Sequence, residues 1–252
     1  MSTQSTIGPG WTRIHHDRVG STNDEARRLA EQGAAHGTVV TADEQGAGRG
    51  RQGRSWVTPP GTALAASVIV RDLPDVTLLP LIAGVATAET VGDTAMLKWP
   101  NDVVLVGRAR PDGPADGARL RKIAGILCEG RPDHGWAVAG IGLNVAVDLA
   151  GLPDDVAGRA ATMGGVAADR DDVLDRLARR LDEVLRLDVE TLLARWSARD
   201  VLRDRDVRWE RPGDGDPEHG RADGVDGDGR LRVVGADGEI WRLDAGDVHL
   251  VS

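Results

Sequence analysis

The sequence predicts an α+β fold, in which a mixed β-sheet with helices packed on one side is followed by a small all-β domain. In the larger part, segments with helical apolar spacing are interleaved with short strand-like apolar runs. From about Arg205 the sequence pattern changes to short strands in which polar and apolar residues alternate, such as "DVRWE", "GRLRVVG" and "EIWRLD". Asp-Gly or similar turns lie between several of them. We therefore expect one domain over residues 1–203 and a second over residues 204–252.

Four helices are expected in the larger domain. The first begins near Thr22, which has capping-box spacing with Glu25 and precedes an apolar stripe. Apolar residues repeat at helical spacing over 78–92. Asp169 and Asp188 can each cap a further helix that carries leucines on one face.

The strands of the larger domain are expected from short apolar runs bounded by turn residues. These runs are "GTVVTAD", "TALAASVIV", "AMLKW", "DVVLV", "KIAGILCEG" and "WAVAGIGLNV". The last two follow each other directly, so we expect them to pair. The segment "RARPDGPADGAR" is polar and rich in Pro and Gly, which predicts a loop, and residues 145–168 lose periodicity and are also expected to form a loop.

Composition restricts the classes of function. Hydrophobic residues make up 40% of the 252 residues and charged residues 28%, which is ordinary for a soluble globular protein. The net charge of −9 argues against a protein that coats DNA or an anionic membrane. The single Cys128 excludes an intramolecular disulfide and a cysteine-based zinc site. Without a signal-peptide pattern or a membrane-length apolar run, we expect a cytoplasmic protein.

The stretch "DEQGAGRGRQGRSW" between two predicted strands is the first candidate binding element. Its glycines let the backbone approach a ligand closely, and Arg49, Arg51 and Arg54 supply charged groups suited to phosphate or carboxylate. It lacks the Gly-Lys-Ser/Thr of a Walker loop. A mobile solvated loop and an RNA-binding segment are the alternatives that the pattern alone leaves open.

Three further motifs place polar groups at strand ends. "KWPNDV" interrupts a strand at Pro100 and presents Asn101 and Asp102, although a plain turn has the same chemistry. Lys122 precedes the apolar run of "KIAGIL", where a lysine is more often an edge residue than a catalyst. "GIGLNV" ends at Asn144, and its glycines are equally compatible with packing. The six histidines show no metal-ligand spacing.

The order of these motifs resembles the biotin protein ligase family. The motifs are "STN" at 21–23, "GRGRQGRSW" at 48–56, "KWPNDV" at 98–103, "KIAGIL" at 122–127 and "GIGLNV" at 140–145. The resemblance covers about residues 13–145, and the ending "GEIWRLDAGDVHL" is similar to that family's SH3-like domain. It implies a catalytic domain like that of class II tRNA synthetases, followed by a small SH3-like β-barrel.

The resemblance implies an activity in two steps. Biotin would react with ATP to give biotinyl-5′-AMP and pyrophosphate, and biotin would then pass to a specific lysine of a biotin carboxyl carrier domain of a carboxylase. ATP and biotin would be substrates, with Mg²⁺ held through the ATP phosphates and no certain metal ligand from the protein. Only twenty residues precede "STN", where bifunctional members carry a DNA-binding domain. We therefore expect a monofunctional ligase with no DNA or membrane partner, as a monomer or weak homodimer.

The family pattern also implies roles for individual positions. The implied biotin-binding residues are Ser21, Thr22, Asn23, Gln45, Gly48, Arg49, Lys122, Gly125 and Gly142. The implied ATP- and phosphate-binding residues are Arg51, Arg54, Trp56, Lys98, Asn101, Asp102 and Asn144. The implied catalytic residues are Lys122, Asp102 and Arg51. These roles agree with physical chemistry, because two anionic reactants must meet and cations must offset their repulsion. The segment after Asn144 contains no Trp that could stack on adenine.

Two rival interpretations remain at this stage. A lipoate–protein ligase would share the adenylation chemistry and a catalytic lysine, although the Gly-Arg loop followed by "KWPND" favours the biotin branch. A non-catalytic nucleic-acid-binding protein could use the same loop and the small β-domain. The acidic character of that domain, as in "DGVDGDG", counts against it.

Overall fold

The computed structural model describes residues 2–107, 119–209, 217–244 and 248–251. The expected loop "RARPDGPADGAR" falls almost entirely on residues 108–118, which lie outside the described residues. No helix in the described part of the chain is both long and apolar enough to cross a bilayer.

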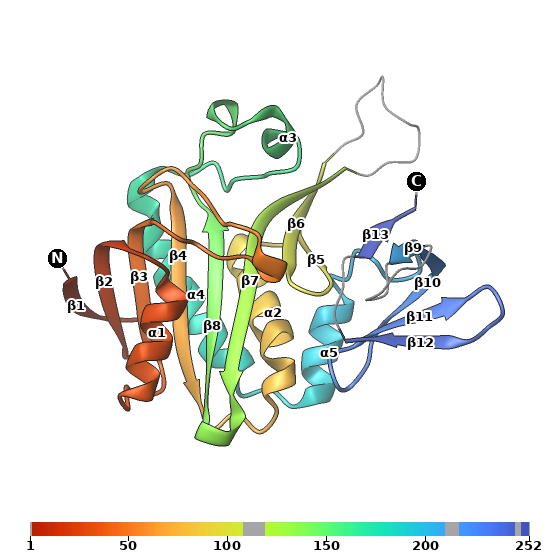
Figure 1. Ribbon diagram of the computed structural model, residues 1–252, viewed down its shortest axis with the longest axis horizontal. Coiled ribbons are helices and arrows are strands. Elements are labelled where there is room, and N and C mark those ends of the chain that lie inside the picture. Colours follow the sequence, from red (N-terminus) through yellow and green to blue (C-terminus); the bar gives the residue numbers. More distant parts are fainter. Residues whose placement is uncertain (1, 108–118, 210–216, 245–247, 252) are drawn as a thin grey trace.

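An eight-stranded mixed sheet forms the larger domain, as the sequence predicts (Figure 1). Its strands are β1 Ser2–Ile7, β2 Trp11–Val19, β3 Thr38–Gln45, β4 Ala63–Arg71, β5 Ala95–Lys98, β6 Asp102–Gly107, β7 Arg119–Arg131 and β8 Trp136–Asn144. They lie in the order β1-β2-β3-β4-β8-β7-β6-β5, with β2 and β3 parallel and the other neighbours antiparallel. The expected pairing of β7 with β8 is confirmed.

Helices cover the sheet unequally on its two faces. The helices are α1 Thr22–Glu31, α2 Leu79–Val91, α3 Asp154–Ala157, α4 Arg170–Val184 and α5 Val189–Ser197, with short 3₁₀ turns that include η1 Arg51–Gly53. Helices α2, α4 and α5 pack on the face of the main hydrophobic core, which confirms the expected arrangement. Helix α1 packs on the opposite face against β3, β4 and β8 (Figure 1). Strand β4 serves both faces, because Val68 and Val70 join the main core and Ile69 joins the smaller core under α1.

The helices begin close to the residues predicted from the sequence, but not every predicted capping hydrogen bond is present. Asp188 caps α5 by accepting the N–H of Thr191 at 2.7 Å, as predicted. The predicted capping box of Thr22 and Glu25 is wrong. Ser21 occupies the N-cap position without a side-chain cap bond, and Thr22 instead bonds to a side chain of β3. A tertiary contact has therefore replaced the local one.

The small C-terminal domain is a five-stranded antiparallel sheet. Its strands are β9 Asp206–Trp209, β10 Glu218–Val225, β11 Leu231–Gly235, β12 Ile240–Leu243 and β13 Val248–Leu250, in the order β12-β11-β10-β9-β13. The alternating pattern of β9, in which Val207 and Trp209 are buried between exposed neighbours, gives this sheet one apolar face. The indole N–H of Trp99 donates to the Gly229 carbonyl at 3.0 Å and joins this domain to the larger one. We retain residues 1–203 and 204–252 as the proposed domain limits.

Candidate active site

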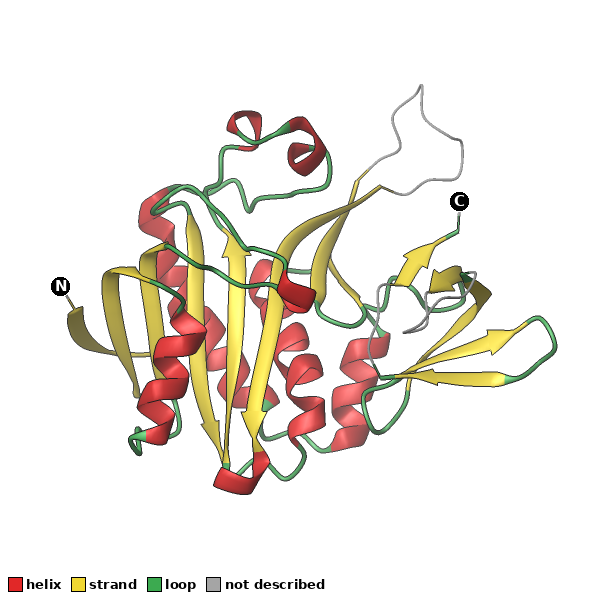
Figure 2. Cartoon of the chain, in the orientation of Figure 1, coloured by secondary structure: helices red, strands yellow, loops and turns green. Residues whose placement is uncertain are grey.

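A cavity on the α1 side of the main sheet brings the separate motifs of the sequence together. The loop between β3 and β4 crosses the front of β8 and β7, and its short turn lies over them (Figure 2). The cavity is lined by Ser21, Thr22, Asn23, Gln45, Arg49, Gly50, Arg51, Arg54, Ser55, Trp56, Ala65, Lys98, Trp99, Pro100, Asn101, Asp102, Lys122, Gly125, Ile126, Leu127, Gly140, Ile141, Gly142 and Val248. Polar groups from residues 21 to 142 therefore converge on one space.

One end of the cavity is an uncharged hydrogen-bond cluster at the start of α1. Gln45 Oε1 accepts the backbone N–H of Thr22 at 2.9 Å and lies 3.1 Å from the Thr22 hydroxyl. The fully buried hydroxyl of Ser67 lies 2.8 Å from the Thr22 hydroxyl and 2.6 Å from Asn23 Oδ1. Buried polar groups are stable only when they are hydrogen-bonded, so this cluster is held in one arrangement.

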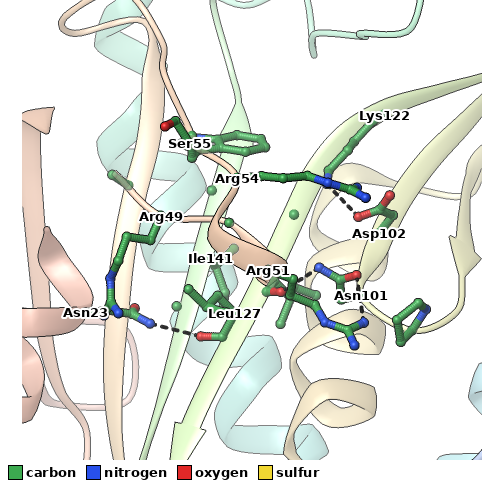
Figure 3. A pocket seen from close by; sticks show the side chains of 18 of the residues that line it. Asn23, Arg49, Arg51, Arg54, Ser55, Asn101, Asp102, Lys122, Leu127 and Ile141 are labelled. Carbon is green, nitrogen blue, oxygen red and sulfur yellow. Dashed lines mark hydrogen bonds and ion pairs between the residues drawn. The ribbon is translucent and has the colours of Figure 1, made fainter. Parts of the chain in front are cut away.

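Asn23 is built into the wall of this end. Its side-chain amide donates to the Leu127 carbonyl at 3.1 Å (Figure 3) and to Glu129 at 2.8 Å. On the neighbouring strand a Cβ on Gly140 would overlap the Asn23 side chain, so only glycine allows this approach. Contacts with β7 and β8 therefore hold the Asn23 side chain in place.

The loop residue Arg49 is tied to the same wall. Its guanidinium donates to Asp24 at 2.7 Å and to Glu129 at 2.9 Å. Farther along the loop, Arg51 reaches across the cavity and donates to Asn101 Oδ1 at 3.4 Å (Figure 3). The Gly/Arg loop therefore spans the cavity from its uncharged end to the strand end that carries the "KWPND" motif.

The other end of the cavity is charged. Lys122 Nζ lies 2.6 Å from Asp102 Oδ1, and the two residues lie on the paired strands β7 and β6 (Figure 3). Asn101 is fixed beside them by two hydrogen bonds of 2.9 Å to Ile126. Its side-chain amide donates to the Ile126 carbonyl, and its backbone carbonyl accepts the Ile126 N–H. The Lys122 and Asp102 side chains are both partly exposed, so the Lys122 ammonium group is accessible to an anionic ligand.

Trp56 lies between these two ends. Its ring centroid is 5.6 Å from Lys122 Nζ, a cation–π distance. A Cβ on Gly142 would lie 2.6 Å from the indole, and one on Gly125 would lie 3.0 Å from the Lys122 side chain. The two glycines therefore provide the space in which the indole and the lysine side chain lie.

Two of the predicted site residues do not line the cavity. Gly48 lies just outside it, where any Cβ would overlap the Trp56 carbonyl. Asn144 is buried at the end of β8 and donates to the Ala161 carbonyl at 2.9 Å, so it holds the following segment against the sheet. Ser67 and Glu129 were not foreseen, although Ser67 is the one polar side chain inside the run "ALAASVIV".

A separate group of possible metal ligands lies on β2 and β3. Side-chain atoms of His15, Asp17 and Asp43 lie within 4.8 Å of one another. Asp43 also pairs with the Arg170 guanidinium at 2.8 Å. Because the Arg170 guanidinium already neutralises the Asp43 carboxylate, we do not propose that these three residues bind a metal ion.

Comparison with known families agrees with this geometry. Residues 16–146 match the model of the biotin/lipoate A/B protein ligase family, and residues 204–251 match the biotin protein ligase C-terminal domain. The chain belongs to the biotin/lipoate A/B protein ligase family. The resemblance found in the sequence motifs is therefore confirmed.

Relatives in this family differ in how much of their length is matched. The chain is 34% identical over 264 residues to the biotin–[acetyl-CoA-carboxylase] ligase of Mycobacterium tuberculosis, covering 96% of this chain and 91% of that relative. It is 33% identical over 171 residues to the bifunctional ligase/repressor BirA of Bacillus subtilis, covering 63% of this chain. That match spans 48% of the Bacillus protein, about half its length.

Solved structures of biotin protein ligases have the same fold. The ligase of Aquifex aeolicus in complex with biotin and ATP has a TM-score of 0.75 at 25% identity, covering 95% of this chain and 98% of that chain. The ligase of Leishmania major in complex with biotinyl-5-AMP has a TM-score of 0.60 at 26% identity, covering 92% and 98%. The predicted α+β class with a small C-terminal β-domain is confirmed.

Proposed function

We propose that this protein activates biotin with ATP to biotinyl-5′-AMP and transfers biotin to a specific lysine of a biotin carboxyl carrier domain. The observation that carries the proposal is the polarity of one cavity. An uncharged hydrogen-bond cluster around Thr22 and Gln45 occupies one end, and the Lys122–Asp102 pair with nearby arginines occupies the other. Biotin has the same polarity, with a neutral ureido ring at one end and a carboxylate at the other.

The uncharged end would hold the ureido ring. A cyclic urea offers N–H donors and a carbonyl acceptor, and Ser21, Thr22 and Gln45 carry the matching hydroxyl and amide groups. Because Ser21 and Thr22 are buried, a ligand that leaves one of their polar groups without a hydrogen-bond partner binds more weakly by the cost of desolvating that group. Gly48 and the backbone at Arg49 would let the loop approach the ring closely, with Gly125 and Gly142 beneath it.

The charged end would bring two anions together. A carboxylate oxygen of biotin attacks the α-phosphorus of ATP, the bond to the β-phosphate oxygen breaks, and pyrophosphate leaves. Lys122 would meet both the carboxylate and the α-phosphate, and Arg51 and Arg54 would meet the other phosphate oxygens. The positive groups lower the barrier by offsetting charge that is closest together in the transition state.

Transfer to the carrier would follow at the same end. The carrier lysine amine attacks the carbonyl carbon of the mixed anhydride and an amide bond forms. AMP leaves with the bonding electron pair, and the amine nitrogen gives up a proton to solvent. Asp102 would accept hydrogen bonds at the acceptor-lysine side, beside Asn101. The adenylate is reactive toward water, so coverage by the loop that carries Trp56 would protect it.

Several finer features belong to the same proposal. Mg²⁺ would be held through the ATP phosphates. Asp102 and Asn101 carry oxygen donors of the kind that Mg²⁺ prefers, and these oxygens would become available to the ion when the phosphates draw Lys122 and Arg51 away from them. Bound there, it would neutralise phosphate charge. Lys98 would contact phosphate, and Asn144 would act by fixing the segment at Ala161. We further propose a cytoplasmic ligase that is a monomer or weak homodimer. It would have no DNA or membrane partner, which the net charge of −9 supports.

The proposal is tested by transfer to a carrier domain. The protein is incubated with ATP, Mg²⁺, a carrier domain and either biotin or lipoate, and the intact mass of the carrier is measured. We expect one biotinyl group per carrier and none on a carrier whose acceptor lysine is replaced by arginine. Modification by lipoate but not biotin would establish the lipoate–protein ligase instead. A salt-dependent titration with duplex DNA checks the absence of a DNA partner.

A further inference from the structure

Ser67 is the polar residue in the middle of β4, and its side chain is fully buried. It does not line the cavity, yet its hydroxyl contacts two residues that do. The hydroxyl lies 2.6 Å from Asn23 Oδ1 and 2.8 Å from Thr22 Oγ1. A hydroxyl has a single hydrogen, so only one of these two contacts can have Ser67 as its donor.

The orientation of Asn23 decides which contact that is. The Asn23 amide nitrogen faces two acceptors, the Leu127 carbonyl at 3.1 Å and the Glu129 carboxylate at 2.8 Å. The opposite atom, Oδ1, therefore faces Ser67, and an amide oxygen can only accept. The Ser67 hydrogen is thus committed to Asn23.

The orientation of Gln45 is fixed in the same way. Its Oε1 lies 2.9 Å from the Thr22 backbone N–H, which can only donate. The Gln45 amide nitrogen therefore faces away from Thr22 as a donor. The Thr22 hydroxyl hydrogen has two acceptors, Ser67 Oγ at 2.8 Å and Gln45 Oε1 at 3.1 Å. Whichever acceptor it takes, no described residue of this cluster donates to Thr22 Oγ1, and the two lone pairs of that oxygen are left to accept.

We infer that Ser67 is a positioning residue that determines specificity, because it fixes Thr22 Oγ1 as an acceptor for a ligand N–H. Together with the amide donor of Gln45, this creates a site for an N–H next to a carbonyl, the edge of a cyclic urea. A ring without N–H leaves the Thr22 acceptor unpaired and is disfavoured. The inference rests on the proposed function and identifies Thr22 Oγ1, positioned by Ser67, as the atom that recognises an N–H of the ligand ring.

The test uses Ser67→Ala in the full chain, with ligand affinity measured by titration calorimetry. Without Ser67, the Asn23 oxygen loses its donor and the Thr22 hydrogen keeps only the longer contact to Gln45 Oε1 at 3.1 Å, so the hydroxyl can turn its hydrogen toward the ligand. Biotin should bind about tenfold more weakly, the size expected for one neutral hydrogen bond in a buried cluster. The rate of pyrophosphate release at saturating biotin should stay near that of the parent protein, because Ser67 touches none of the charged groups.

Two biotin analogues separate this role from a general loss of structure. In each, one of the two ureido N–H groups is replaced by oxygen to give a cyclic carbamate. For the isomer that lacks the N–H bound by Thr22, Ser67→Ala should cause little further loss of affinity, because the interaction is already absent. An equal tenfold loss for biotin and for both isomers would overturn the inference, as would unchanged biotin affinity.

Matched variants complete the design. Thr87→Val removes an equally buried hydroxyl, which donates to the Ala83 carbonyl within α2 on the other face, and should leave biotin affinity unchanged. Ser67→Cys keeps nearly the same volume and replaces the hydroxyl by a weak donor, so it should reproduce the defect even if Ser67→Ala folds poorly. Absence of biotin binding in the parent protein would instead contradict the proposed function.

Discussion

Lys122 Nζ and Asp102 Oδ1 lie 2.6 Å apart, on the antiparallel strands β7 and β6. The lysine side chain is 36% exposed and the aspartate side chain 24% exposed, so both remain accessible from the cavity. The carboxylate holds the ammonium group at the charged end while no anion is bound. Biotin and ATP would then replace the contact with Asp102 by contacts with the biotin carboxylate and the α-phosphate, so loss of Lys122 should affect adenylation strongly.

Lys122→Ala should impair adenylation far more than biotin binding. Loss of one such electrostatic contact costs on the order of 10²–10³ in rate. The ureido ring contacts lie at the other end of the cavity and only the carboxylate contact is lost, so biotin binding should stay comparatively intact. ATP-dependent pyrophosphate release and calorimetric biotin binding measure the two quantities. Arg186→Ala, which removes an exposed cation paired with Asp182, is the matched control. An equal loss of affinity without a rate defect would make Lys122 a ring contact.

Asp102→Asn should affect the second half-reaction or its metal dependence. The amide keeps the size and one acceptor oxygen, but it no longer balances the ammonium group 2.6 Å away. We expect carrier biotinylation to slow more than pyrophosphate release, and the Mg²⁺ concentration for half-maximal rate to rise. Single-turnover transfer from preformed adenylate separates the two effects. Equal slowing of both half-reactions at every Mg²⁺ concentration would assign Asp102 only to holding Lys122.

Gly142→Ala should disturb the seating of Trp56. The new Cβ would lie 2.6 Å from the indole Cε2, closer than packed atoms approach, so the ring must move. Because the indole also covers Lys122, we expect adenylation to fall by about 10²-fold, the scale of a one-ångström misplacement near reacting groups. Gly227→Ala is the control and should leave activity unchanged, because its new Cβ would meet no heavy atom of the described residues within 4 Å. Parent-like activity in Gly142→Ala would show that the indole position is unimportant.

Asp200 should make stability depend on pH. Burial raises the pKa of its carboxyl above the ordinary 3.8, although the N–H groups of Leu202 and Arg203 oppose this. The folded state therefore keeps a proton that the unfolded chain releases. The corresponding stability is present below pH 3.8 and is lost as pH rises through the folded pKa.

Urea denaturation of the parent protein and of Asp200→Asn from pH 4 to pH 8 measures this effect. The asparagine keeps an oxygen for the Leu202 N–H and cannot titrate. The difference in unfolding free energy, parent minus variant, should decrease as pH rises. A constant difference, or one that increases, would mean that the carboxyl is not perturbed in the folded protein.

Apolar periodicity was sufficient for most elements of the fold. Helices α2 and α4 and the central strands β4, β7 and β8 bury long apolar runs, and such runs report directly on a core. Strand β1 carries "STQSTI" with almost no buried side chain, so its sequence has no burial signal and only pairing with β2 makes it a strand. The capping box failed for a similar reason, because a partner on β3 outcompeted the local bond.

For the candidate site too, the sequence predicted some residues and only the structure revealed others. Residues at strand ends and in the Gly/Arg loop, such as Lys122 and Arg51, were predicted because their residue types are unusual at those places. Ser67 and Glu129 act through residues distant in sequence, and each is ordinary for a strand when considered alone. Their roles follow from donor and acceptor geometry, which only the folded chain supplies.

Pyrophosphate release without any carrier protein reports directly on whether this site adenylates biotin. The protein is incubated with ATP and Mg²⁺, with and without biotin, and both pyrophosphate and the nucleotide product are followed. Release should require biotin, and biotinyl-5′-AMP should form, stay bound and be trapped by hydroxylamine. Release that is independent of biotin, or no release with biotin in a folded protein that binds ATP, would contradict the proposed function.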